Sequence, residues 1–302
     1  MNRKHRLPSS TYYKTPDGRF KIALLGASYS SWRDPYHLLL TISWPGFLAL
    51  IVLLYLASNA VFALAYLVGG DCIENARPGS FLDAFFFSVQ TMATIGYGKM
   101  APGTIYAHAL VTLEALVGLL VISMATGLMF ARFSRPTARV IFSRVAVIAS
   151  NEGVPTLMFR AANQRHNLIL EAQMRVYLLQ DEVTGEGHYM RRFYDLKLVR
   201  SQTPAFALSW TAMHPIDQTS PLYGATAESL AQVNATISIT LTGLDETVSQ
   251  TVNARYTFSI RDLLWDMRFV DIFYITPDGQ RSIDYTRFHD VIPVQQVQGD
   301  DK

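Results

Sequence analysis

The first half of the chain alternates long apolar runs with short polar segments, and this pattern predicts a membrane domain. Residues 46–68 form an uncharged run, and residues 105–130 form a second run whose only charged residue is Glu114. Each run has the roughly 20 residues that a helix needs to cross a bilayer. We therefore expect two spanning helices, an outer helix over 45–68 and an inner helix over 104–133.

Between the two spans lies a third apolar segment, residues 80–93, which is too short to cross. As a helix it would extend about 21 Å, and Ser80 followed by Asp83 is a helix-start signal. A membrane tolerates a segment that enters and returns only where its backbone is buried in protein or lines water. The segment is therefore predicted to be a re-entrant pore helix whose carboxyl end points inward and favours a cation.

From about residue 140 the pattern changes to short runs of alternating apolar and polar positions, separated by turn residues. Many short strands at such spacing are typical of a β-sandwich. The predicted strands are 145–148, 156–160, 169–179, 206–210 and 237–241, and short helices are expected over 225–232 and 260–265. The predicted fold class is an α-helical two-span membrane pore domain with a re-entrant pore helix, followed by an all-β sandwich.

The segment before the first span divides into an arm and a short helix. Residues 1–31 are polar and basic, which fits a cytoplasmic arm. In residues 32–44, Asp34 is a candidate helix cap, Pro35 suits the first helical position, and the aromatic residues are types that lie at head-group level. We expect an interfacial helix here because a Pro-Gly pair interrupts the pattern before the span. The alternative is that this helix is only the first turn of the span.

Charge sets the orientation and excludes several functions. The arm and the segment after Phe130 are basic, whereas the loop over 69–82 is not, so the positive-inside rule places both termini in the cytoplasm. A net charge of +2 without a long basic run argues against a nucleic-acid partner. Cys72 is the only cysteine, the seven histidines show no metal-ligand spacing, and there is no nucleophile elbow or phosphate loop. We therefore do not expect an enzyme.

Candidate chemistry centres on the five residues after the pore helix, Thr94, Ile95, Gly96, Tyr97 and Gly98. A K⁺ filter replaces the hydration shell of the ion with rings of backbone carbonyls, and glycine allows backbone geometry that other residues resist. One strand cannot encircle an ion, so several chains around an axis are implied. A bare Gly-x-Gly is common in loops, but its place between two spans favours a filter. K⁺ is thus the expected permeant ion, bound at the filter only, with no organic cofactor.

The inner helix supplies the candidates for filter support and gating. Glu114 carries a charge that is costly at this depth, and we expect it to support the filter through hydrogen bonds. Ile122, Thr126 and Phe130 are four residues apart and share a face. If that face lines the pore, four Phe130 rings could close it by dewetting, although ordinary helix packing fits the spacing equally well. Gly118 belongs to the same candidate pore lining and admits a bend or a close helix contact.

Five stretches make the chain resemble the bacterial, KirBac-type branch of the inward-rectifier potassium channels. They are Trp32-Arg33-Asp34-Pro35-Tyr36, the filter, Phe133-Ser134-Arg135-Pro136, Leu264-Trp265-Asp266-Met267-Arg268-Phe269 and Asp284-Tyr285-Thr286-Arg287-Phe288-His289. The resemblance covers nearly the whole chain. It implies a homotetramer in the bacterial inner membrane, with a slide helix at 32–44, a pore domain over 45–134, and immunoglobulin-like cytoplasmic sandwiches over 135–302 that extend the pore. It also implies gating at the inner helices and control by anionic lipid.

The lipid-binding candidates are the arginines that flank the spans, Arg33, Arg132, Arg135 and Arg139. Basic residues at this depth attract anionic head groups, but positive-inside topology alone accounts for them equally well. Members of the family have a cluster of basic residues after the inner helix, and uncharged Thr137 and Ala138 reduce the number of charges in that cluster here. Lipid control is therefore expected, whereas activation by a phosphoinositide-like lipid is not assumed.

Several positions depart from the family pattern. Strong rectifiers hold an acidic residue in the cavity, where Ile122 stands here, and a second one in the cytoplasmic pore, where His188 stands, although Glu246 matches an acidic position. Block by Mg²⁺ or polyamine is therefore expected to be weak, and Ba²⁺ is a further expected blocker. Gln90 and Met100 replace the Glu-Arg pair that braces the filter in animal members. Gln90 and Glu114 are thus the candidates for filter support.

One alternative keeps the pore and changes its control: a two-span K⁺ channel gated by a soluble ligand on its β-domain. A nucleotide-binding domain predicts a Gly-x-Gly-x-x-Gly turn after a strand, and residues 140–302 contain none. The sandwich could also dock a soluble partner, which the sequence neither supports nor excludes.

Overall fold

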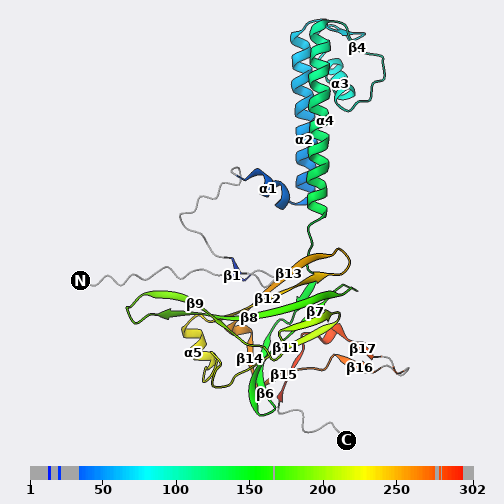
Figure 1. Cartoon of the computed structure of the whole chain (residues 1–302). Coiled ribbons are helices and arrows are strands. Elements are labelled where there is room, and N and C mark those ends of the chain that lie inside the picture. Colours follow the sequence, from blue (N-terminus) through cyan, green and yellow to red (C-terminus); the bar gives the residue numbers. More distant parts are fainter. Residues whose placement is uncertain are drawn as a thin grey trace, which may run out of the picture. The chain divides into compact units, whose positions relative to one another are not determined.

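A computed structural model describes residues 13–14, 20–21, 34–165, 167–275, 279 and 281–294 (Figure 1). The chain divides into two compact units, Gly26–Arg135, and Pro136–Lys302 together with Met1–Leu25. Within the described residues the first unit is mainly helical and the second is built mainly of strands.

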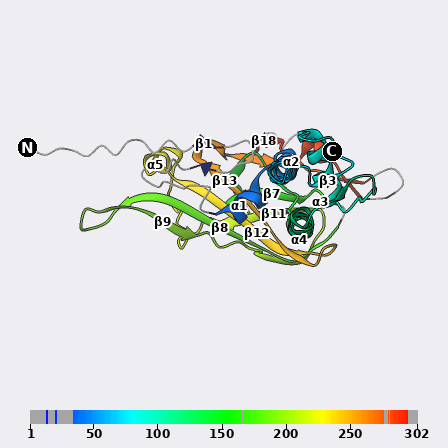
Figure 2. The same ribbon diagram turned by 90° about the horizontal axis from the view of Figure 1, so that it is seen from above.

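The helical unit holds two long helices and two short ones among its described residues. They are α1 (Pro35–Thr41), α2 (Trp44–Val68), α3 (Phe81–Met92) and α4 (Ile105–Phe133). Helices α2 and α4 are long and apolar enough to cross a membrane; they run side by side in Figure 1 and are seen nearly end-on in Figure 2. Tyr66 of α2, Phe87 of α3 and Ala107 of α4 belong to one buried apolar cluster, so α3 packs against both long helices.

Side-chain caps explain where three of these helices begin. A cap supplies an acceptor for the backbone N–H groups that the first turn leaves unpaired. The bonds are His37 N to Asp34 at 3.0 Å, Asp83 N to Ser80 at 3.3 Å and Ala107 N to Thr104 at 3.2 Å. Helix α1 ends at an extended Ile42 before α2 begins, so it is not the first turn of the span.

A short ladder joins the two ends of the segment that carries α3. Strand β3 (Ile73–Glu74) pairs antiparallel with β4 (Ala101–Pro102), and Gly103 N donates to the carbonyl of Cys72 at 2.8 Å. Residues 73–102 therefore form a loop that is closed at its base, with α3 inside it.

The second unit contains two five-stranded sheets. One has the order β10-β8-β12-β13, with β9 paired to β8, and the other has the order β11-β7-β6-β14, with β5 paired to β7. The strands are β5 (Val140–Phe142), β6 (Ala146–Asn151), β7 (Val154–Asn163), β8 (Ile169–Val183), β9 (Tyr189–Asp195), β10 (Gln202–Phe206), β11 (Ser209–Pro215), β12 (Thr236–Asp245), β13 (Gln250–Ser259) and β14 (Leu263–Trp265).

The core of this unit comes from alternate residues of both sheets. Phe159 on β7 and Trp210 on β11 are buried with Leu178 on β8, Ile239 on β12 and Phe258 on β13. Successive side chains of a strand point to opposite faces, so each sheet contributes one apolar face to a sandwich. The predicted fold class, a two-span helical unit followed by an all-β sandwich, is confirmed.

Two local predictions in the sandwich were wrong. The helix expected over 260–265 is a 3₁₀ turn, Ile260–Asp262, followed by β14, which pairs in parallel with β6. The strand expected over 206–210 is the end of β10 and the start of β11, which lie in different sheets. In both places the pairing partner lies far away in sequence, so local alternation could not identify it.

The remaining described elements are short. They are β1 (Tyr13–Lys14) paired with β2 (Phe20–Lys21), α5 (Ala227–Gln232), β15 (Met267–Phe269) paired with β18 (Val291–Pro293), β16 (Phe273–Ile275) paired with β17 (Arg281–Ile283), and a 3₁₀ helix (Tyr285–Arg287). Ile272 and Phe288 pack on Ala162 of β7, so the C-terminal segment covers a second face of that strand.

Candidate functional site

The backbone of the candidate filter alternates in handedness. Thr94, Gly96 and Gly98 have positive φ angles of 55°, 60° and 77°. In a β-strand successive carbonyls point to opposite sides, whereas alternating left- and right-handed residues turn successive peptide groups toward one side. Glycine adopts this conformation freely, while Thr94 is held in it at a cost of about 1–2 kcal/mol. The segment is therefore shaped to offer a row of oxygens to one cation.

Helix α3 sets where this row begins. The N–H of Ile95 donates to the carbonyl of Gln90 at 2.8 Å, and that of Thr94 donates to Thr91 at 3.0 Å. Both bonds tie the first filter residues to the last turn of α3. Gln90 is half-buried, and its main-chain oxygen is what meets the filter.

The sides of the filter are uncovered within one chain. The side chain of Tyr97 is 75% exposed, and a Cβ added at Gly96 or Gly98 would meet nothing within 4 Å. A single strand also supplies oxygens from one side only. Both observations fit a site that is completed by further copies of the chain.

A buried hydrogen-bond chain lies behind α3 and joins three helices. Glu114 of α4 is fully buried and accepts a hydrogen bond from the Tyr66 hydroxyl of α2 at 2.7 Å. Its other oxygen is hydrogen-bonded to Ser88 of α3. Ser88 also lies 3.0 Å from Oδ1 of Asn59, and Nδ2 of Asn59 donates to the carbonyl of Tyr55 at 2.7 Å. Glu114 thus contacts the helix that carries the filter, not the filter strand.

Sequence analysis missed Tyr66, Ser88 and Asn59. The available signal was polarity, since Asn59 and Ser88 are polar residues inside apolar helices, where each needs a partner. The partners come from three helices, so spacing along one helix could not identify them.

Gly118 lies where α4 meets the end of α3. It is buried, and a Cβ added there would lie 2.6 Å from the carbonyl oxygen of Met92. This is a close helix contact rather than an open surface. Its expected role in pore lining stays a prediction.

The candidate gate face of α4 is exposed in the single chain. Ile122, Thr126 and Phe130 are all exposed, and Phe130 is 73% exposed. The Thr126 hydroxyl donates to the carbonyl of Ile122 at 2.9 Å, so it is satisfied within the helix. The face is free to meet other copies or a pore.

Two lipid-binding candidates bond to the end of α1 instead of standing free. Arg132 donates to the carbonyls of Leu39 and Ile42, the latter at 2.6 Å, and its guanidinium lies over the Trp44 ring at 4.7 Å. Arg135 donates to Leu40 at a longer 3.4 Å. These carbonyls are the ones that a helix C-terminus leaves unpaired.

The other candidates lie elsewhere. Arg139 is exposed in the second unit, and Arg33 lies outside the described residues. His188 is exposed in the β8–β9 turn, where its carbonyl accepts from Thr184 N at 2.8 Å. Glu246 lies in the turn after β12 and accepts from Leu168 N at 3.3 Å.

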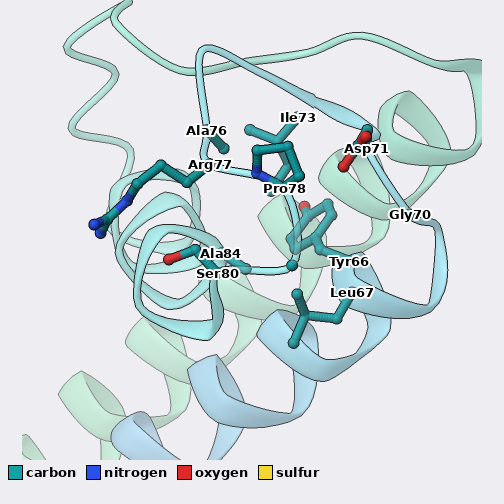
Figure 3. Close-up of a pocket in the computed structure, with 11 residues that line it drawn as sticks. Tyr66, Leu67, Gly70, Asp71, Ile73, Ala76, Arg77, Pro78, Ser80 and Ala84 are labelled. Atoms are coloured by element: carbon teal, nitrogen blue, oxygen red, sulfur yellow. The ribbon is translucent and has the colours of Figure 1, made fainter.

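A small cavity lies beside Tyr66, under the loop after α2 (Figure 3). Its volume is about 20 Å³, enough for one water molecule, and Asp71, Pro78 and Ser80 help to line it. Arg77, also in its wall, forms an ion pair with Asp83 at 2.9 Å. Polar groups of the loop therefore lie close to Tyr66, the first residue of the buried hydrogen-bond chain.

Comparisons with known proteins agree with this geometry. A family model described as "Inward rectifier potassium channel C-terminal domain" matches residues 140–300, and one described as "Ion channel" matches residues 50–135. The chain is 52% identical to inward rectifier potassium channel Kirbac3.1 of Paramagnetospirillum magnetotacticum, over 91% of this chain and 94% of that one. It is 29% identical to human inward rectifier potassium channel 18, over 90% and 69% of the two chains. It is 30% identical to ATP-sensitive inward rectifier potassium channel 12 of Gallus gallus, over 85% and 65%.

Proposed function

Because the chain belongs to the inward-rectifier potassium channel family, we propose that it conducts K⁺ passively through a pore built from four copies. The family is one of ion channels, which are not enzymes, and α2 and α4 are long and apolar enough to cross a membrane. The observation that carries the proposal is the alternating handedness at Thr94, Gly96 and Gly98 directly after α3. Four such strands around an axis would replace the water shell of K⁺ with carbonyl oxygens.

The copies form a closed ring because each strand offers oxygens from one side. Cyclic symmetry closes such an arrangement without leaving a free surface. The exposed Tyr97 side chain beside the candidate filter supports this assembly, because neighbouring copies around the axis would cover it.

Gating takes place at the inner helices. Phe130 lies one turn from the end of α4, and four rings at this level would exclude water from the path. Ile122 is apolar where strong rectifiers are acidic, so block by Mg²⁺ or polyamine is weak. Ba²⁺ blocks at the filter, where it competes with K⁺.

Anionic lipid acts at the cytoplasmic ends of the helices. Arg135, Arg139 and Arg33 are the contacts we assign to head groups, since Arg132 already bonds to two carbonyls. The protein resides in the bacterial inner membrane with both termini in the cytoplasm, an orientation that rests on the basic segments beside the spans.

The deciding experiment is rubidium uptake into liposomes that contain the purified full chain, with K⁺ inside and Na⁺ as the competing ion outside. We expect uptake that Ba²⁺ blocks and Na⁺ does not diminish. Gly96→Ala should abolish it, because φ at Gly96 is 60°. Gly185→Ala is the matched control, since nothing lies within 4 Å of a Cβ there.

Absent uptake in the wild type has two explanations, a shut gate or a filter that does not conduct. Phe130→Ala separates them because it removes the proposed closing ring. Uptake that appears in this variant supports the channel, and uptake that is absent in both proteins in every lipid composition contradicts it.

A further inference from the structure

The buried hydrogen-bond chain behind α3 has a fixed direction, because the carbonyl oxygen at one of its ends can only accept a hydrogen bond. Nδ2 of Asn59 lies 2.7 Å from the carbonyl oxygen of Tyr55 and 3.6 Å from the sulfur of Met92. A carbonyl oxygen has no hydrogen to give, so the nitrogen of the amide must face it. Oδ1 of Asn59 therefore faces Ser88, and the hydroxyl of Ser88 must be the donor in that 3.0 Å bond.

The direction of this bond decides the protonation of Glu114. Ser88 has a single hydroxyl hydrogen, and Asn59 takes it. The bond between Ser88 and Oε1 of Glu114 then needs its hydrogen from Glu114. Tyr66 donates to Oε2 at 2.7 Å. The hydrogen bonds then run from Tyr66 through Glu114, Ser88 and Asn59 to the backbone carbonyl of Tyr55, and each bond contains one hydrogen.

An ionised Glu114 does not fit these contacts. Its Oε1 would compete with Asn59 for the one hydrogen of Ser88, which leaves a buried acceptor unpaired at a cost. Nor do the described groups around it offer a cation. Tyr66 of α2 and Ser88 of α3 bond to it, and Asn59 of α2 bonds to Ser88. Nearby, Cys72 of the loop donates to the carbonyl of Tyr66 and Tyr106 of α4 donates to the carbonyl of Ala65. The cavity next to Tyr66 adds Asp71 and an Arg77 that is already paired with Asp83.

We propose that Glu114 is held as a neutral carboxylic acid that donates to Ser88, and that it positions α3 and hence the filter through this bond. A neutral acid also removes the cost of a buried charge within a membrane helix. Its effect on ion uptake rests on the proposed channel function, whereas its protonation does not.

The proposal makes glutamine at position 114 a near copy of the native group. Its amide nitrogen would donate to Ser88 and its oxygen would accept from Tyr66, as the acid does. If Glu114 instead accepted hydrogen bonds from both the Tyr66 and the Ser88 hydroxyls, the NH₂ group of a glutamine would have to face one of these hydroxyl donors, and that bond would be lost. Glu114→Gln and Glu114→Ala therefore separate the two descriptions.

The first measurement is infrared difference spectroscopy of the purified full chain at neutral pH, after exchange into D₂O. We expect a carbonyl band of a protonated carboxyl group that disappears in Glu114→Gln and persists in Glu228→Gln, a control on an exposed turn of α5. Ser88→Ala removes the acceptor and should shift the band without abolishing it. A wild type with no band from Glu114 overturns the proposal.

The second measurement is rubidium uptake in liposomes as a function of pH. Glu114→Gln should keep wild-type uptake, and Glu114→Ala, which loses both hydrogen bonds of Glu114, should lower it by about ten- to a hundredfold, at about tenfold for each unmet buried hydrogen bond. Uptake by the wild type should fall at alkaline pH, where the acid ionises, and stay level in Glu114→Gln. Equal losses in Glu114→Gln and Glu114→Ala would refute the assignment. If the chain is not a channel, the wild type takes up no rubidium while the infrared band is still present, so the two failures differ.

Discussion

Gly118 lies against the carbonyl oxygen of Met92 so closely that a methyl group at Gly118 would approach that oxygen to 2.6 Å. Met92 is the last residue of α3, two positions before the filter begins. Helix α4 thus touches the backbone that leads into the candidate filter, and glycine is the residue that permits this contact.

We predict that Gly118→Ala displaces the end of α3 and lowers selective uptake. The clash is with backbone, which cannot turn aside as a flexible side chain can, so the free energy of unfolding should fall by about 1–3 kcal/mol. Thermal denaturation and rubidium uptake measure the two effects. Gly127→Ala is the control on the same helix, where nothing lies within 4 Å; a Gly118→Ala protein that behaves like this control would show that the contact is not needed.

Phe130→Ala should increase uptake in lipids where the wild type is closed, because it removes the bulky ring at the cytoplasmic end of the exposed face. Met124→Ala provides the comparison. Met124 is also exposed but is turned about 120° away around α4 at 100° per residue. Equal uptake in wild type and Phe130→Ala, or equal leakage in both variants, would argue that the gate lies elsewhere.

Arg132 and Arg135 should respond differently to substitution by lysine. Lysine keeps the charge of Arg132 but loses the planar fork that reaches two carbonyls and stacks on Trp44. We expect Arg132→Lys to lose about 1–3 kcal/mol of stability, close to the loss in Arg132→Gln.

At Arg135, charge is the property that matters, so Arg135→Lys should keep the wild-type dependence of uptake on the anionic lipid fraction and Arg135→Gln should weaken it. Uptake and thermal denaturation over a series of lipid compositions test both positions. If Arg132→Lys kept wild-type stability and lipid dependence, this would show that Arg132 acts through its charge on lipid head groups.

His214 should make the sandwich less stable in mild acid. Its ring is buried, Nδ1 lies 2.7 Å from the carbonyl of Lys197, and Nε2 lies 2.8 Å from the Ser220 hydroxyl. Since the carbonyl only accepts, Nδ1 carries the hydrogen and Nε2 accepts. Burial lowers the pKa of His214 below its ordinary value, and the contact with Lys197 opposes this only in part.

The unfolded chain therefore binds the proton more readily than the folded one. Stability is full above about pH 6.5 and falls as the pH drops from there toward the folded pKa, by at most about 1.4 kcal/mol per pH unit. Chemical denaturation of the full chain at several pH values measures the slope. His214→Gln should flatten it, and His188→Gln, a change at an exposed turn, should not; an unchanged slope in His214→Gln would assign the effect to other groups.

How much could be predicted from sequence depends on the range of each interaction. Helices α2 and α4 follow from the length of their apolar runs, and the caps at Asp34 and Ser80 are local signals. The five candidate filter residues could be singled out because positive φ angles favour glycine, and Gly96 and Gly98 both adopt them.

Interactions between distant elements were not predictable in this way. The need of Asn59 for a partner was visible, but Ser88 as that partner depends on how α2 and α3 pack. The basic charge of Arg132 suggested lipid, whereas its guanidinium bonds to the end of α1. Leu263–Trp265 is a strand only because β6, more than a hundred positions earlier, offers it an edge.

The ladder between β3 and β4 joins the two ends of the segment over 73–102, and Ser88 and Met92 inside the segment contact α4 as well. Both of its ends lie in the same two-residue strand ladder, and the hydrogen bond from Gly103 N to the Cys72 carbonyl extends that ladder. Closing the loop there fixes the distance between its two ends, so a segment exchanged at this ladder begins and ends at the same places in the host chain. A chimera that carries this stretch from a relative should therefore inherit the donor's ion preference and keep the host's gate, provided that it retains Ser88 and Met92, which contact Glu114 and Gly118 of α4.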